Sequence, residues 1–274
     1  MNRYQSYQIL NCSFRTALAL SVERKIFENG VLGLEFQSID RTSVKLYLKE
    51  NDSVYNYLKI FQDTSCEILS YDTYSIALPQ SAWEHFDPFF LCEGVQIFPE
   101  TQKKSANPST LNLFLKPESS FGTGRHPTTQ LGATLMKSYL GGRKSLLDIG
   151  CGSGILSIYA KKSLVEQVDG VEIDPLALEN AQYNAQLNAV EIGLYSTLEQ
   201  VSDSYEVIVA NMQLPTLQFL IPSFKKHTRP KGIWIISGVS LAELSIFESL
   251  CPFLERKEIL HREEWVGAVF QFIL

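Results

Sequence analysis

Hydrophobic and polar positions in the first 80 residues alternate with two different periods. Some runs have the two-residue period and the aromatic and β-branched content of strands, and others have the spacing of an amphipathic helix. In chain order these segments are the strand-like run 4–10, the helical stretch 19–30, the strand-like runs 31–38 and 43–50, the helical stretch 53–64 and the strand-like run 67–78. This order predicts a small α+β domain of ferredoxin-like topology.

The pattern changes between residues 81 and 120. The run SAWEHFDPFF has the composition of a short connecting helix, so we expect the first domain to span 1–80 and a linker helix to span 81–91. The segment PETQKKSANPST, at 99–110, is polar and interrupted by prolines, which is typical of a loop or hinge. We expect the second domain to occupy 92–274.

From Ser145 onward, continuous apolar runs alternate with helical stretches. The apolar runs are SLLDIG, QVDGVEI, YEVIVAN and GIWIISG, and the helical stretches between them include ILSIYAKK and PLALENAQYNAQLN. Strands that lack alternation and are separated by helices are typical of a mostly parallel sheet with both faces covered. The last segment, KEILHREEWVGAVFQFIL, contains two strand-like runs and no helix, which predicts an antiparallel hairpin at one edge of the sheet.

Composition narrows the function classes. The chain has 274 residues and a formal net charge of −6, whereas nucleic-acid binders usually carry an excess of basic residues. It has no apolar run near the ~18–20 residues that span a bilayer, and its first residues lack the pattern of a secretory signal. Its five cysteines are far apart with no CxxC pair, so we expect reduced thiols in the cytoplasm and no metal site.

A glycine turn is the clearest candidate site. The segment LLDIGCGSGIL predicts a strand, a turn at Gly150, Gly152 and Gly154, and a helix. The next predicted strand ends at Glu172, about twenty residues after the turn. An acid at about this sequence separation accepts hydrogen bonds from ribose hydroxyls in nucleoside-binding α/β folds. The spacing GxGxG after Asp148, in place of GxGxxG, is typical of S-adenosylmethionine methyltransferases. A plain tight turn and a surface position for Glu172 stay open as alternatives.

Two residues beside this turn have structural interpretations. Asp174 precedes Pro175, which favours an N-cap and first helical residue over a ligand. Cys151 has no histidine near it in sequence to activate a thiol, so we expect a structural role for it.

Taken together, the motifs FGTGRHPTTQL, LLDIGCGSGILSIYA, GVEIDPLALENAQYNAQLN and VIVANMQL resemble the PrmA-type ribosomal protein methyltransferases. The resemblance runs from about Trp83 to Trp265, and FGTGxHPTT is highly specific to that family. It implies an α/β, Rossmann-like methyltransferase domain with a seven-stranded, mostly parallel sheet, preceded by a substrate-recognition domain. It also implies S-adenosylmethionine as cofactor and, as substrate, lysine or N-terminal amino groups of the eleventh large-subunit protein at the ribosomal stalk base. We expect a monomer with no nucleic-acid or membrane partner.

The resemblance also implies roles for residues that the glycine turn does not contain. The loop FGTGRHPTT, Phe121 to Thr129, closes over the cofactor in that family, with Thr129 donating to the methionine carboxylate and Thr128 nearby. Asn211 and the backbone carbonyl of Met212 then hold the acceptor amine. Ordinary structural roles remain open for Phe121, for His126 and for an asparagine that ends a strand.

A neutral acceptor such as Asn211 suits the chemistry of an amine. A lysine with a pKa near 10.4 loses its proton at pH 7 at a cost of roughly 4.6 kcal/mol, whereas an α-amine near 7.8 costs about 1 kcal/mol. A carboxylate beside the nitrogen favours the charged form and raises that cost. We therefore predict that Asn211→Asp lowers turnover more than it lowers cofactor affinity.

The chain departs from the family pattern at three places: KPESSFGTG replaces DPGLAFGTG, ANMQL replaces ANILA, and EEWVGA replaces EEWCRI. These departures do not change the fold prediction, but they leave more than one identity possible for the molecule that accepts the methyl group. The alternatives are a protein-lysine methyltransferase with another substrate, a nucleic-acid amino methyltransferase and a binding module without activity. The basic run KKHTRPK, at 225–231, favours a solvated loop over a docking patch.

Overall fold

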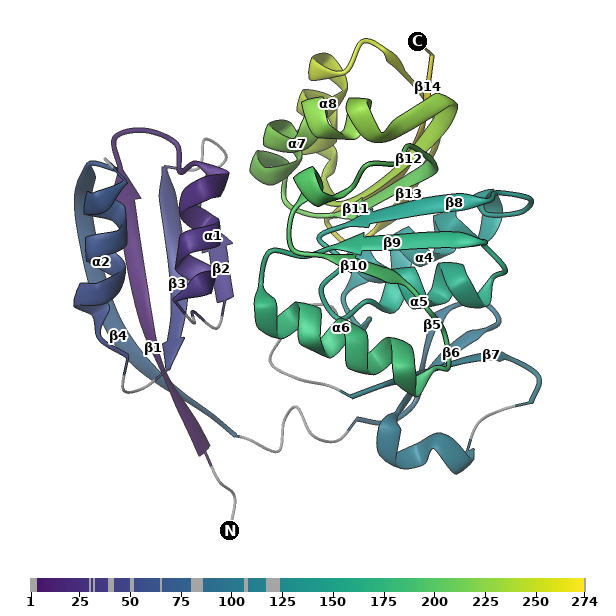
Figure 1. Cartoon of the computed structure of the whole chain (residues 1–274), viewed down its shortest axis with the longest axis horizontal. Helices are drawn as coiled ribbons and strands as arrows, with labels where there is room; N and C mark the ends of the chain where they lie inside the picture. The colour runs from purple at the N-terminus through teal and green to yellow at the C-terminus, as the bar shows by residue number, and fades with distance from the viewer. Residues whose placement is uncertain are drawn as a thin grey trace. The chain divides into compact units, whose positions relative to one another are not determined.

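The computed structural model describes residues 4–29, 31, 33–38, 42–49, 52–64, 66–79, 86–105, 108–116 and 124–273. The chain divides into two compact units, Met1–His85 and Phe86–Leu274 (Figure 1). Each unit has its own hydrophobic core and is described separately.

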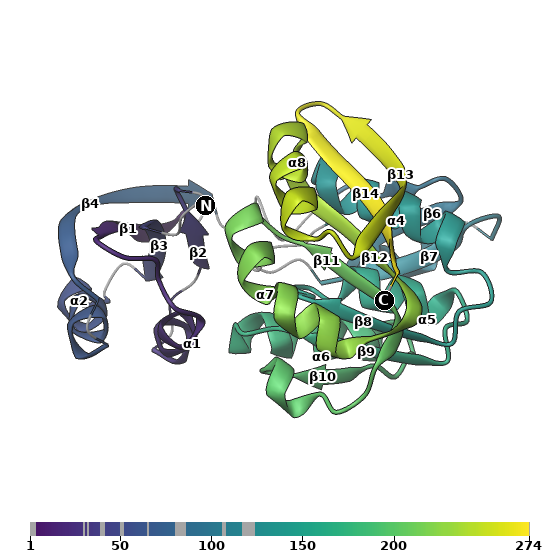
Figure 2. The ribbon, with the colours of Figure 1, turned by 90° about the horizontal axis from the view of Figure 1, so that it is seen from above.

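The first unit has the predicted order of strands and helices. Its elements are β1 (Tyr4–Phe14), α1 (Leu20–Glu28), β2 (Gly33–Phe36), β3 (Ser43–Lys49), α2 (Val54–Asp63) and β4 (Ile68–Pro79). The strands pair antiparallel in the order β2-β3-β1-β4, and both helices cover the same face of this sheet (Figure 2). The sequence pattern predicted the ferredoxin-like topology correctly.

Alternation along the strands explains why one face is covered. Val44, Leu46 and Leu48 of β3 are fully buried and pack with Leu10 of β1 and with Phe61 of α2. The residues between them in β3 are only partly buried. A period of two therefore separates a core face from an exposed face, as in other antiparallel sheets.

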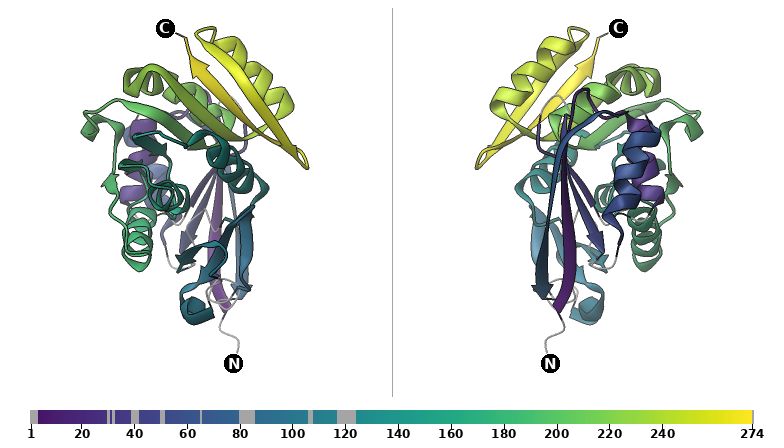
Figure 3. Two further views of the ribbon diagram at one scale, coloured as in Figure 1. Left: turned by 90° about the vertical axis from the view of Figure 1, so that its right-hand side faces the viewer. Right: turned by 90° about the vertical axis from the view of Figure 1, so that its left-hand side faces the viewer.

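The second unit is built on a seven-stranded sheet of order β10-β9-β8-β11-β12-β14-β13. Its strands are β8 (Ser145–Ile149), β9 (Gln167–Val171), β10 (Gly193–Tyr195), β11 (Tyr205–Asn211), β12 (Thr228–Ser240), β13 (Leu254–Arg262) and β14 (Trp265–Phe272). The first five in spatial order run parallel, whereas β14 and β13 are antiparallel and form the edge hairpin that Figure 3 shows in yellow. The fold class and the terminal hairpin are confirmed.

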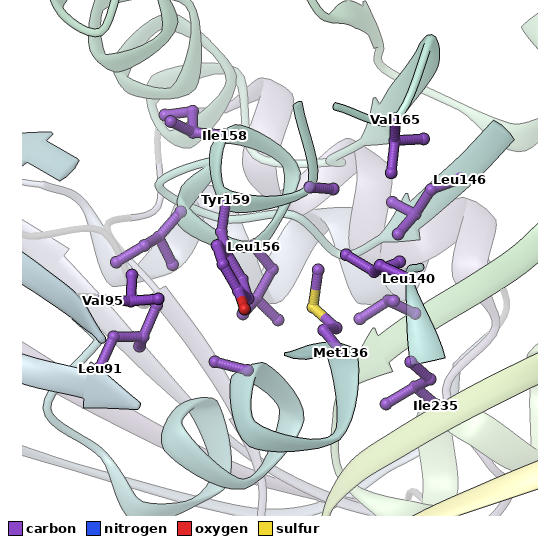
Figure 4. Packing of buried hydrophobic residues seen from close by; sticks show 14 of the residues in the cluster. Leu91, Val95, Met136, Leu140, Leu146, Leu156, Ile158, Tyr159, Val165 and Ile235 are labelled. Carbon is purple, nitrogen blue, oxygen red and sulfur yellow. The ribbon is translucent and has the colours of Figure 1, made fainter. Parts of the chain in front are cut away.

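Helices cover both faces of this sheet, so its central strands are buried on both sides. The helices are α4 (Pro127–Tyr139), α5 (Ile155–Lys162), α6 (Pro175–Leu187), α7 (Leu214–His227) and α8 (Leu241–Leu250). Helix α5 contacts both α4 and α6, and α7 contacts α8 (Figure 1). Figure 4 shows the core under α4 and α5, where Met136 and Tyr159 lie among aliphatic side chains from both helices and the strands.

The region before α4 differs from the prediction. Phe89–Cys92 (β5), Val95–Pro99 (β6) and Leu111–Leu115 (β7) form a three-stranded sheet that the sequence pattern did not predict. The expected linker helix 81–91 is therefore wrong at residues 89–91, which are strand, and residues 81–85 lie outside the described part. The second unit begins at Phe86, not at 92.

The expected hinge at 99–110 is also corrected. Glu100–Ser105 form a 3-10 helix that follows β6, and the chain then enters β7 of the same small sheet. Because β6 and β7 pair parallel within the second unit, this segment is a crossover connection inside one unit. The prolines and polar residues that suggested a hinge are those of an ordinary strand connection.

Candidate active site

The glycine turn lies at the carboxyl end of β8, where it leads into α5. Gly150, Gly152 and Gly154 all have positive φ, at +74°, +53° and +76°. The N–H of Gly150 donates to the carbonyl of Val171 at 2.8 Å, which ties the turn to the end of β9. A side chain at Gly150 would collide with the Met212 methyl group. The turn therefore needs glycine for its conformation and for the close approach of Met212.

Glu172, one residue beyond β9, holds the other side of this turn. Its carboxylate accepts from the N–H of Gly152 at 2.9 Å and from the N–H of Asp174 at 3.0 Å. Burial raises the pKa of Glu172 above its ordinary value, while these two donors oppose the rise. The carboxylate is thus fixed at the edge of the sheet, which excludes a freely solvated surface acid.

Asp148 is a second buried acid beside the turn. Its Oδ2 accepts from the hydroxyl of Ser157 at 2.7 Å, and burial, aided by the charge of Glu172, raises its pKa to about 6. Cys151 is buried as well, and burial raises the pKa of its thiol well above the ordinary value. The thiol therefore stays protonated, which agrees with a structural role for Cys151.

Asp174 caps α6, as the sequence predicted. Its Oδ1 accepts from the N–H of Leu176 at 2.9 Å, and Pro175 occupies the first turn of the helix. Its own N–H donates to Glu172 at 3.0 Å, and the charge of its carboxylate contributes to the raised pKa of Glu172.

The FGTGRHPTT segment is described from Gly124 onward, so the open question about Phe121 lies outside the described residues. His126 caps α4 and its Nδ1 lies 2.8 Å from Oγ1 of Thr128. Its ring packs edge-on against Trp265, with 5.2 Å between the centroids. His126 therefore has the structural role that the sequence left open, since it orders the first turn of α4.

Thr129 is the residue that joins this segment to the parallel sheet. Its hydroxyl is buried and accepts from Nδ2 of Asn211, the last residue of β11, at 3.2 Å. The hydroxyl keeps its own hydrogen to donate, and the carboxamide of Asn211 keeps its oxygen as an acceptor. Two segments separated by about eighty residues thus meet at the carboxyl edge of the sheet, where α/β folds bind their ligands.

Met212 follows Asn211 in a tightly restricted backbone. Its N–H donates to the carbonyl of Ser237 at 3.0 Å. Gly238 has a φ of +91°, and a Cβ there would lie 2.7 Å from the backbone nitrogen and oxygen of Met212. Sequence reasoning missed Gly238, although a glycine directly after the apolar run IWIIS signals a close backbone approach.

Ser237 was missed too, and no sequence signal identifies it. It pairs with Asn211 in the register of β11 and β12 and is almost completely buried. Within the described part of the chain its hydroxyl has no hydrogen-bond partner. The hydroxyl therefore adds an unsatisfied polar group next to the Asn211 end of the site.

Comparison with known proteins decides the family. A family model described as "Ribosomal protein L11 methyltransferase (PrmA)" matches residues 6–272. The chain belongs to this family. Its members named ribosomal protein L11 methyltransferase include one from Thermosipho melanesiensis, 37% identical over 187 residues that cover 68% of this chain and 70% of the relative. Another, from Thermotoga petrophila, is 27% identical over 259 residues that cover 91% of this chain and 93% of the relative.

A solved structure supports the same assignment. The ribosomal protein L11 methylase of Lactobacillus delbrueckii subsp. bulgaricus superposes with a TM-score of 0.64 and 26% identity, covering 69% of this chain and all of that chain. The chain is therefore a methyltransferase of the family that the FGTGRHPTT and glycine-turn motifs indicated. Among the described residues, no group of three or more His, Cys, Asp and Glu side chains could hold a metal ion, and no helix is long and apolar enough to cross a membrane.

The residues at the sheet edge fit the methyl donor of such an enzyme. Asp148 and Glu172 are two acids with raised pKa values on either side of the turn, so a cation between them lowers their mutual repulsion. The N-cap of α5, Gly154, makes no side-chain cap bond; the backbone N–H of Ser157 bonds to Asp148, and the N–H groups of Ile155 and Leu156 before it are the ones we assign to a ligand. A donor that carries an ammonium, a carboxylate and a ribose matches these groups.

Proposed function

We propose that the chain transfers methyl groups from S-adenosylmethionine to amino groups of ribosomal protein L11. The observation that carries this proposal is the hydrogen bond between Asn211 and Thr129, because it joins the residue expected at the acceptor to the residue expected at the cofactor. The family of the chain and the names of its relatives support L11 as the substrate.

The cofactor would lie at the carboxyl edge of the parallel strands. S-adenosylmethionine supplies a methyl group already activated on a sulfonium sulfur. The chain's own residues bind and orient: Glu172 offers carboxylate oxygens to ribose hydroxyls, Asp148 offers a negative charge to the ammonium group, and Thr129 offers its hydroxyl hydrogen to the carboxylate. The remaining residues proposed for the cofactor are Thr128, Gly150, Gly152 and Gly154.

The acceptor amine would be held by Asn211 and by the backbone carbonyl of Met212. One hydrogen of Asn211 Nδ2 is donated to Thr129, which orients the carboxamide, and its carbonyl oxygen is the acceptor for an N–H of the amine. A neutral oxygen holds the amine hydrogens without favouring the protonated form, so the lone pair is easier to free than beside a carboxylate. Gly238 and Ser237 keep the Met212 backbone in place from the other side.

We also propose that the first unit recognises the protein substrate and that the enzyme works in the cytoplasm as a monomer. The first unit contains none of the residues proposed for the cofactor, which leaves substrate recognition as its role. All five cysteines are free, which suits a reducing compartment.

Radiolabelled S-adenosylmethionine tests the proposal directly. The full chain is incubated with purified ribosomal protein L11, with total RNA, with a lysate depleted of L11, or with no acceptor. We expect label in L11 alone, at lysine or N-terminal amines that mass spectrometry locates. Label in RNA or in another lysate protein would show that L11 is not the substrate and would identify the labelled molecule as the substrate instead. Absence of label from every acceptor, together with tight binding of S-adenosylhomocysteine, would indicate a binding module.

A further inference from the structure

Two asparagines of α6 and the asparagine at its C-cap are buried on one side of the helix. Asn180, Asn184 and Asn188 recur every four residues, so they lie on one face, and none is more than 3% exposed. A buried carboxamide costs free energy unless its hydrogen bonds are made, so a row of three indicates polar partners on the facing elements.

Asn188 and Asn184 bond to the edge of β7 that β6 does not use. Asn188 accepts from the N–H of Phe114 at 2.9 Å and donates to its carbonyl at 2.7 Å, as a neighbouring strand would. Asn184 accepts from the N–H of Lys116 at 2.9 Å. Since β7 is the last strand of its sheet, these side chains satisfy an edge that would otherwise lack partners.

Asn184 differs from Asn188 because it also reaches the glycine turn. Its Nδ2 donates to the carbonyl of Ser153 at 3.0 Å and to Oδ1 of Asn180 at 2.7 Å. Every polar atom of the Asn184 side chain is therefore satisfied, which is the condition under which a buried network stabilises one geometry. The two hydrogens of the Asn188 carboxamide go elsewhere, one to the Phe114 carbonyl and the other to the Asn184 carbonyl at 2.8 Å, which leaves no donor for the turn.

The backbone of the turn is close to α6 at the same place. A Cβ at Gly154 would lie 3.1 Å from Cβ of Ala181, the residue that precedes Asn184 by three positions. On the other side, the ammonium group of Lys116 lies 5.1 Å from the centre of the Tyr183 ring. Helix α6 is thus packed against the glycine turn and against the end of β7, and Asn184 is the residue that bonds to both.

We propose that Asn184 is a positioning residue that fixes the glycine turn relative to the end of β7, and that it thereby sets the affinity for the methyl donor. The end of β7 matters because the chain runs on from Lys116 to the Gly124–Thr129 segment, which contributes Thr129 to the site. The inference rests on the proposed function in that it takes the glycine turn and Thr129 to hold the same ligand. Asn184 touches neither ligand nor reacting atoms; it acts through Ser153 and Lys116.

The test compares Asn184→Ala with Asn188→Ala in the full chain. Both variants delete a buried carboxamide and remove a hydrogen bond to the backbone of β7 or of Lys116 directly after it, so both lower the melting temperature. Of the two, Asn184→Ala also removes the hydrogen bond to the Ser153 carbonyl. We expect its dissociation constant for S-adenosylhomocysteine, measured by calorimetry, to rise about tenfold, and that of Asn188→Ala to rise by less than about threefold.

A third variant separates the hydrogen bond that the Asn184 side chain accepts from those that it donates. Asn184→Asp keeps an oxygen for the Lys116 N–H but loses the donors to the Ser153 carbonyl and to Oδ1 of Asn180, so we expect it to bind the ligand as weakly as Asn184→Ala. It also provides the test if the alanine variant does not fold. In steady-state kinetics we expect a raised KM for S-adenosylmethionine, with kcat at saturation changed by less than about twofold. The variant loses binding energy that the ground state and the transition state share, so the chemical step keeps its rate. Equal losses in Asn184→Ala and Asn188→Ala, or normal binding by Asn184→Asp, overturn the proposal.

Amide hydrogen exchange tests the role of Asn184 without a bound ligand. In Asn184→Ala the segment Gly150–Ile155 should exchange faster than in the wild type, whereas in Asn188→Ala only the β7 segment should change. A wild-type chain that binds no S-adenosylhomocysteine contradicts the proposed function, and the exchange comparison then decides the role of Asn184 by itself. Unchanged exchange of the turn in Asn184→Ala would refute that role.

Discussion

The two glycine-rich segments of the second unit are held in place by different interactions. In the turn Gly150–Gly154 the groups that are held belong to the backbone: the N–H groups of Gly150 and Cys151 donate to the Val171 carbonyl at 2.8 and 3.1 Å, and the side chains of Glu172 and Asn184 bond to the backbone of Gly152 and Ser153. Added side chains would meet Met212 or Ala181 directly. The geometry of this turn is therefore fixed by space and by φ angles, which few substitutions preserve.

In the second segment Gly124 is restricted in the same way, with a φ of +82° and with Ile97 2.7 Å from an added Cβ, but at residues 125–129 side chains make the contacts. Arg125 stacks on Phe89 at 4.7 Å and donates to the Asp87 carbonyl at 2.9 Å, and Thr129 accepts from Asn211. Each of these contacts can be removed without a steric clash. The comparison teaches that substitutions in the turn should act together on folding and binding, whereas those at residues 125–129 should give smaller, separable effects.

The largest effect is expected from Gly150→Ala. The new methyl group meets the end of the Met212 side chain, and the turn requires the alanine to adopt a positive φ. We therefore expect about a hundredfold loss in affinity for S-adenosylhomocysteine. Gly142→Ala is the matched control, because Gly142 also has a positive φ, +77°, but has no atom within 4 Å of the added Cβ. Calorimetry should find its affinity within about twofold of the wild type, since it carries the backbone strain alone. Equal losses in the two variants would mean that Met212 does not restrict the turn.

Asn211→Asp should have the next largest effect, and on a different quantity. The carboxylate favours the protonated amine and loses the donor to Thr129, so we expect kcat to fall about fiftyfold. Cofactor affinity should fall only about threefold, because the turn and Glu172 are untouched. Steady-state kinetics and calorimetry measure the two separately, with the exposed Asn56→Asp as a control for the same chemical change. Losses of equal size would show that Asn211 serves the cofactor alone.

Protonation of Asp148 should weaken cofactor binding at low pH. Its pKa is raised to about 6, so the fraction ionised falls from about nine tenths at pH 7 to one tenth at pH 5, and affinity for the cationic ligand should fall about tenfold. Asp148→Asn should bind more weakly at pH 7 and lose this pH dependence. Calorimetry at a series of pH values checks both, and an equally steep profile in the variant would assign the titration to another group.

The same shift has the opposite consequence for the stability of the ligand-free chain. A carboxyl group whose folded-state pKa is raised contributes stability below its unfolded pKa, near 4, and that contribution is lost as pH rises through about 6. Asp148→Asn should therefore remove a decrease in melting temperature between pH 4 and pH 6.

The smallest effect is expected from Thr129→Val, which removes the hydroxyl at nearly constant volume. Loss of one hydrogen bond to a charged group should weaken S-adenosylhomocysteine binding about fivefold to tenfold, with little change in melting temperature beyond the lost bond to Asn211. Thr129→Ser retains the hydroxyl and should restore most of the affinity. A serine variant as weak as the valine variant would show that the methyl group of Thr129, and not its hydroxyl, matters.

Most of the fold was predictable because its signals are local. Alternation in β3, unbroken apolar runs in β8 and β11, and the caps at Asp174 and Gly154 all lie within a few residues of the elements they define. The glycine turn and Glu172 were found for the same reason, since strand, turn and acid follow one another at fixed spacing.

The missed features depend on partners far away in the chain. The polar positions of NAQYNAQLN suggest an exposed helix face, yet Asn184 and Asn188 are buried because an edge of β7, some seventy residues earlier, needs partners. Gly238 is required because its φ is +91° and because an added Cβ would lie 2.7 Å from the Met212 backbone. The β5–β7 sheet was missed because its strands are short and separated by the polar segment that resembled a hinge.

A crystal structure of the chain with S-adenosylhomocysteine tests the central claim most directly. The account predicts a ligand whose ribose hydroxyls bond to Glu172 and whose carboxylate bonds to Thr129, so that both glycine-rich segments contact one molecule beside Asn211. A ligand bound to the glycine turn but out of reach of Thr129, or one bound elsewhere, would contradict it.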